Sequence, residues 1–144
     1  MTWPPTPGAA PLDAFEAARQ RLLAALAGLK EEQCRSHPEP GAQSVLDALG
    51  VLVAYERAVA GAARASAPAP EALPPTGEAE ALARGAQLMM PALVHDLNAA
   101  TNDLRTALGA LAADGQAATA TLVVRALDRA TARVDRNAEL LGVR

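Results

Sequence analysis

The fold is decided by residues 44–63, which read SVLDALGVLVAYERAVAGAA. Ser44 is a favourable helix N-cap, and Asp47 follows three residues later in a capping-box arrangement, so a helix is expected to begin here. The following apolar positions recur at steps of three and four, which is typical of the buried stripe of an amphipathic helix. These positions are Val45, Leu49, Leu52, Tyr55 with its neighbour Glu56, and Val59. The helix is predicted to end before Ser66, where a proline-rich segment begins.

Three other segments show the same helical period. They predict helices over residues 12–32, 76–113 and 117–141. Pro91 lies inside the second of these, so we expect a kink or a break near Met90. Asp114-Gly115 is expected to stop that helix.

Together the four segments predict an all-α protein, a four-helix bundle. Residues 66–77 contain four prolines and are predicted to be irregular. Because this connection is long, it allows a crossover between the second and third helices in place of a tight hairpin. Glycines within the helices would let their axes approach closely; they are Gly50, Gly61, Gly85 and Gly109.

The composition agrees with a single helical domain. The chain has 144 residues, of which 51% are hydrophobic but only 2% aromatic, and an alanine-rich sequence of this kind favours helix over strand. The formal net charge is −3, and the basic residues alternate with acids along the helices, which is typical of solvated faces. We therefore expect no nucleic-acid partner.

The N-terminal residues are proline-rich and show no targeting signal. Residues 1–11 are predicted to form an extended, proline-rich arm, and residues 12–144 a single domain. Trp3 in that arm either docks on the bundle or stays mobile. The first residues lack the basic and apolar regions of a signal peptide, and no window reaches the roughly 18 uncharged apolar residues of a membrane span. We expect a cytoplasmic protein without a membrane partner.

Few residues carry recognisable chemistry. Cys34 and His37 are two metal-ligand types three residues apart, but zinc sites need three or four ligands, so we predict no metal here. His95 and Asp96 are adjacent, and adjacent helical residues point about 100° apart, so Asp96 is poorly placed to orient His95 as a base. The pairs Asp128-Arg129 and Asp135-Arg136 are expected to be surface ion pairs.

The segment from Leu29 to Leu52 resembles the DinB/YfiT-like superfamily of four-helix bundles. In that family a Pro-Gly turn runs into a Trp-Ser-Val-x-Glu-x-x-x-His-Leu pattern. Pro40-Gly41, Ser44-Val45, Asp47 and Leu52 match it, whereas Gln43 stands at the Trp position and Val51 at the His position.

The resemblance also implies where relatives hold a metal. Their other two histidines lie near the end of the last helix, which corresponds here to the stretch starting at Val134. Val134 and either Asn137 or Ala138 occupy those positions, with the acid kept as Asp135. Intact members bind a divalent metal, and some act as thiol-dependent transferases or hydrolases. Because valine cannot coordinate a metal, we carry over neither a metal nor another cofactor, and no catalytic residue.

Three functions remain open. The favoured one is a non-catalytic protein that binds a small apolar ligand or a protein partner, with a homodimer implied by the resemblance. Its candidate pocket residues are Val51, Tyr55, His95, Val134, Asn137 and Ala138. The second is a transferase or hydrolase that uses a site drawn from Tyr55, Glu56, His95 and Asp135. The third is a purely structural assembly subunit.

Overall fold

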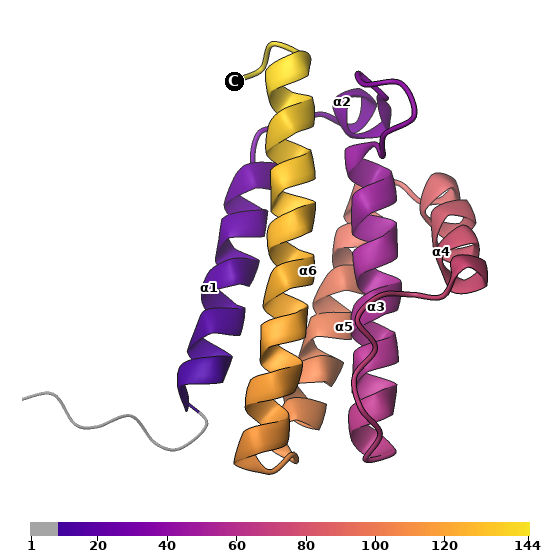
Figure 1. Ribbon diagram of the computed structural model, residues 1–144. Coiled ribbons are helices and arrows are strands. Elements are labelled where there is room, and N and C mark those ends of the chain that lie inside the picture. The colour runs from indigo at the N-terminus through magenta and orange to yellow at the C-terminus, as the bar shows by residue number, and fades with distance from the viewer. Residues whose placement is uncertain (1–8) are drawn as a thin grey trace, which may run out of the picture.

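A computed structural model describes residues 9–144 of the chain. The first eight residues of the predicted arm, with Trp3, lie outside the described part. The described part is all-α and contains six helices and no strand (Figure 1). They are α1 (Ala9–Leu26), α2 (Glu31–Arg35), α3 (Val45–Arg64), α4 (Pro75–Gln87), α5 (Met90–Gly109) and α6 (Ala113–Leu140).

The four long helices α1, α3, α5 and α6 form the bundle, and α4 packs on the outside of α3 (Figure 1). Helices α1 and α6 lie side by side and run in the same direction, while α3 and α5 run together in the opposite direction. After α3, residues 65–74, here called the crossover linker, return along the bundle to α4. The prediction of a bundle with a long crossover between its second and third long helices is thereby confirmed.

The ends of α1 differ from the prediction. The helix begins at Ala9, three residues before the expected start, because Pro11 falls in the first turn, where the missing proline N–H costs no helical hydrogen bond. It ends at Leu26 and not at Glu32, since Gly28 adopts the left-handed backbone conformation with φ +83°. Glu31 and Glu32, the last two residues of the predicted helix, begin the separate short α2, which continues to Arg35.

The predicted break near Met90 is confirmed. Leu88 and Met89 are extended and separate α4 from α5, and Pro91 stands in the first turn of α5, where it is tolerated. The prediction that Asp114-Gly115 stops a helix was wrong: α5 ends at Gly109, and Asp114 lies in the first turn of α6. An acid there interacts favourably with the positive end of the helix dipole.

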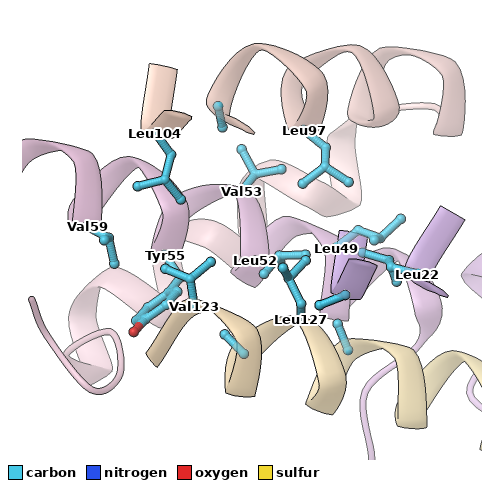
Figure 2. Packing of buried hydrophobic residues seen from close by; sticks show 14 of the residues in the cluster. Leu22, Leu49, Leu52, Val53, Tyr55, Val59, Leu97, Leu104, Val123 and Leu127 are labelled. Atoms are coloured by element: carbon cyan, nitrogen blue, oxygen red, sulfur yellow. The ribbon is translucent and has the colours of Figure 1, made fainter. Parts of the chain in front are cut away.

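The core is built from one apolar stripe on each long helix. Figure 2 shows leucine and valine side chains of α3, α5 and α6 gathered in the core, with Leu22 of α1 beside Leu49. Full burial of a side chain of this size contributes roughly 1.5–3 kcal/mol. The residues with 0% exposure include Phe15, Leu22, Leu49, Val59, Leu104, Leu108, Val123, Leu127 and Val134.

The capping box predicted at the start of α3 is present. Ser44 Oγ accepts a hydrogen bond from the Asp47 amide at 3.0 Å, and Asp47 Oδ2 accepts one from the Ser44 amide at 3.1 Å. Two otherwise unpaired amides are thus satisfied where α3 enters the core. This contact sets the register of all the α3 residues that follow.

Helix α4 contacts α3 through two facing glycines. A Cβ added to Gly50 would lie 3.1 Å from the carbonyl oxygen of Ala81 and 3.4 Å from the Cα of Gly85. By contrast, a Cβ added to Gly61 in the same helix would meet nothing within 4 Å. Close approach of helix axes through glycine therefore occurs at the Gly50–Gly85 pair, whereas Gly61 faces open space.

This contact predicts opposite behaviour for two substitutions in α3. Gly50→Val should lower the free energy of unfolding by about 1–3 kcal/mol, because the added atoms collide with the backbone of α4. Gly61→Val, the matched control, should be neutral or slightly stabilising, since valine is a better helix former than glycine. Urea unfolding followed by circular dichroism measures both. Equal effects of the two changes would show that α4 does not press on Gly50 in solution.

Candidate functional site

A cavity of about 230 Å³ lies between α3, α6 and the chain that crosses over from α3 to α4. Helix α3 contributes one wall with Val51, Leu52 and Tyr55, and α6 the opposite wall with Ala126 and Ala130. The other lining residues are Gln43, Ala48, Ala72, Leu73, Glu78 and Arg129. Most of these side chains are apolar, and Glu78 and Arg129 add one charge of each sign. This space is called the α3/α6 cavity below.

Tyr55 ties the crossover linker to the bundle. Its hydroxyl donates a 2.7 Å hydrogen bond to the carbonyl oxygen of Pro70, and its ring is buried with 3% exposure. Burial raises the pKa of Tyr55, against a lowering influence of Arg129. The phenol therefore stays protonated and holds the linker beside the cavity (Figure 2 shows its oxygen at the edge of the core).

Of the candidate pocket residues, the structure brings only Val51 and Tyr55 to this cavity. Val134, Asn137 and Ala138 lie further along α6, have at most 1% exposure and are not among the cavity's lining residues. Their packing inside the bundle, on the core side of α6, separates them from the hollow. His95 is exposed on α5, also outside the lining.

Asn137 has a structural partner. Its Nδ2 donates a 3.0 Å hydrogen bond to the carbonyl oxygen of Gln43, just before α3. One turn earlier on α6, Arg133 pairs with Glu39 of the same loop at 2.8 Å. Both contacts hold the loop that leads into α3 against α6, so Asn137 serves the fold at this position.

The residues at the positions matched to the metal ligands of relatives do not fit a metal ion. Val51, Val134 and Ala138 have no donor atom, and the Asn137 amide nitrogen is engaged with Gln43. Across residues 9–144, no group of three or more His, Cys, Asp or Glu side chains lies close enough to share an ion. We therefore derive no metal-dependent step for this chain.

Cys34, His37 and Asp96, the remaining residues with candidate chemistry, each have a separate environment. Burial raises the pKa of the Cys34 thiol, which has 1% exposure, so the reactive thiolate is disfavoured. Nε2 of His37 lies 2.9 Å from Oδ2 of Asp47, the acid of the capping box that Ser44 begins. Asp96 pairs with Arg84 at 3.1 Å and so does not orient His95.

The sequence pattern of the DinB superfamily matches residues 14–137. The match covers every helix of the bundle except the outer turns of α1 and α6. The chain belongs to the DinB superfamily. Comparison with curated proteins and with solved structures finds no match.

The second set of residues considered for catalysis is not assembled into one site. Tyr55 is bonded to the crossover linker, and Asp135 pairs with Arg144 near the C-terminus. Glu56, in contrast, points into the bundle interior. Because each of these residues has a different neighbourhood, they do not form the linked acid–base pair that proton transfer to one substrate requires.

Glu56 is a buried carboxyl group in the centre of the bundle. It has 0% exposure, and its Oε2 accepts a 2.9 Å hydrogen bond from the Thr101 hydroxyl of α5. Its Oε1 has no hydrogen-bond partner, and neither does the buried Nε of Arg19. Burial raises the pKa of Glu56 to about 7, although Thr101, Arg19 and Arg105 act in the opposite direction. A signal for this group was visible in the sequence, since Glu56 shares a position on the apolar stripe with Tyr55.

This burial predicts a pH-dependent stability. Above the ordinary carboxyl pKa of 4.5 the unfolded chain ionises at Glu56, whereas the folded chain keeps its proton up to about pH 7. The protonated Glu56 therefore makes its full contribution to the free energy of unfolding below pH 4.5, and this contribution is lost as the pH rises to about 7. Relative to the wild type, Glu56→Gln should therefore gain roughly 3 kcal/mol in free energy of unfolding across this range.

Urea titrations at a series of pH values measure the difference. The exposed Glu32→Gln is the control and should follow the wild type at every pH. Parallel pH profiles for the wild type and Glu56→Gln would contradict the buried, protonated state.

Proposed function

We propose that this DinB-superfamily protein binds a small, largely apolar ligand in the α3/α6 cavity without transforming it. The observation that carries the proposal is the cavity itself, with apolar walls from α3 and α6 and a linker held beside it by the Tyr55–Pro70 hydrogen bond. Its volume of about 230 Å³ lies below the roughly 300–1,000 Å³ typical of pockets for drug-sized molecules. The ligand is accordingly small.

The chemistry of the lining supports binding over catalysis. Tyr55, Glu78 and Arg129 are its titratable residues, and the Tyr55 hydroxyl is already engaged with the linker. A nucleophile paired with a base, which covalent catalysis requires, is not formed by these side chains. The alternative is a transferase or hydrolase, metal-independent or metal-dependent, that uses an unrecognised site, and turnover of a bound compound would favour it.

Filling the cavity should abolish binding. Val51→Phe places a ring into the space between α3 and α6, so the dissociation constant of a probe such as 1-hexanol should rise by about tenfold or more. The matched control is Val94→Phe, because Val94 is half-buried on α5 and lines neither the α3/α6 cavity nor the hollow between α1 and α6. Chemical-shift titration of the labelled protein measures affinity and locates the probe. Unchanged hexanol binding in Val51→Phe, or shifts confined to residues elsewhere, would contradict the proposal.

A homodimer is a second proposal. It is supported by a hollow of about 240 Å³ between α1 and α6 with small apolar lining residues, among them Pro11, Ala14, Ala117 and Ala120. Small side chains of this kind let a helix of a second copy approach closely. No helix of the described part is long and apolar enough to cross a membrane.

Light scattering coupled to gel filtration tests the dimer, with the expected mass twice that of the 14.7 kDa chain. Ala117→Arg places a bulky charge in the hollow and should shift the protein to the monomer. Ala24→Arg, an exposed position of α1 that is not among the residues lining that hollow, is the control. A monomer in the wild type would refute the dimer.

A further inference from the structure

Arg125 and Arg129 of α6 lie near the α3/α6 cavity and have no ion-pair partner among residues 9–144. In residues 9–144 every arginine except Arg57, Arg125 and Arg129 donates a hydrogen bond to an acceptor of another residue. Arg129 was expected to pair with its neighbour Asp128, but Asp128 pairs with Arg21 of α1 at 2.9 Å. The prediction of an Asp128–Arg129 ion pair was wrong because the two adjacent side chains leave α6 in different directions.

Arg125 and Arg129 are one turn apart on α6 and share a second hollow. This space has a volume of about 350 Å³ and is also lined by Leu122, Glu71 and Ala72. Arg129 and Ala72 line the α3/α6 cavity as well. The α3/α6 cavity and this second hollow therefore lie side by side, and Arg129 and Ala72 border both.

Acidic side chains nearby do not neutralise this pair by contact. Glu71 on the crossover linker and Glu78 on α4 border the two spaces, yet neither belongs to an ion pair within 4.0 Å in the described part of the chain. Glu71 raises the pKa of Tyr55 and Arg129 lowers it, so both charges lie close enough to Tyr55 to influence its hydroxyl. An anionic ligand would compete with Glu71 for the arginines.

We propose that the ligand is a small organic acid, whose apolar body occupies the α3/α6 cavity and whose carboxylate is bound by Arg129 and Arg125. This inference rests on the proposed function and adds the chemical class of the ligand. A guanidinium group offers two parallel N–H donors that match a carboxylate, and such charge-assisted hydrogen bonds are about twice as strong as neutral ones. The apolar walls select against small, fully polar anions, which gain nothing from burial there.

The test compares three probes at neutral pH: hexanoate, 1-hexanol and acetate. On the wild type, hexanoate should bind about tenfold more tightly than either of the others, because only hexanoate has both the chain and the carboxylate. Arg129→Gln should remove the advantage of hexanoate over hexanol, because the carboxylate loses its guanidinium partner. Glu71→Gln should strengthen hexanoate binding, since it removes the competing carboxylate. Both residues are exposed, so these variants should keep the fold, which circular dichroism checks.

Arg57→Gln is the matched control. Arg57 is exposed on α3 and has no ion-pair partner among residues 9–144, but it lines neither the α3/α6 cavity nor the second hollow. It should leave all three affinities unchanged. If hexanol binds as tightly as hexanoate and Val51→Phe blocks both, the organic-acid inference is overturned while ligand binding in the cavity stands. If acetate binds as tightly as hexanoate, the apolar body plays no part and the inference is equally overturned. Binding of none of the probes would overturn the proposed function as well.

Discussion

The parallel course of α3 and α5 is the constraint on which the rest of the structure depends. A helix of 20 residues such as α3 is about 30 Å long, and the chain must travel back over most of that length before α5 can start beside it. The return is made by the crossover linker and α4, outside the four-helix core. Because the linker is rich in proline, it cannot pack as a further helix, and the α3/α6 cavity is the space left beneath it. The crossover linker and α4 form an outer layer on the bundle. Two contacts hold this layer on α3, namely the Gly50–Gly85 contact and the Tyr55–Pro70 hydrogen bond.

The interior of the bundle is less uniformly apolar than its composition suggests. Glu56 is held between α3 and α5 by Thr101, and the arginines of α1 and α5 lie close enough to influence its proton. Arg105 itself pairs with Glu16 of α1, so α1 and α5 are linked by polar contacts where their backbones approach less closely than those of α1 and α6. Burial of a carboxyl group with one unsatisfied oxygen opposes folding, and the neutral acid is the form in which the bundle tolerates it.

Much of the helical architecture followed from local patterns. Ser44 and Asp47 specify the start of α3 through contacts within four residues, and the apolar stripes specify which faces are buried; both kinds of information are local. The break before Pro91 was predictable for the same reason. Asp114-Gly115 was misread because an acid followed by glycine suits the start of a helix as well as its end, and only the packing of α6 along α1 decides between them.

The candidate site depended on contacts that local patterns do not encode. Tyr55 was placed from the helical period of α3, and Val51 from its match to a histidine position of the family motif. Val134 and Ala138 were also placed from that motif, which does not reveal that both are buried in the core and outside the lining of the cavity. Arg129 was assigned to its sequence neighbour, whereas its availability follows from Arg21, more than a hundred residues earlier in the chain, taking Asp128.

Helix α4 is held on the bundle by few buried residues, and this has a consequence for its motion. Its buried residues are Ala81 and Gly85 only, and its contacts are almost all with a single helix, α3. Little apolar surface is exposed when such an element detaches, so its local opening costs far less than global unfolding. Glu78 and Leu73, which border the cavity, belong to this weakly held layer. A path into the cavity can therefore open by transient detachment of the outer layer while the four-helix core remains intact.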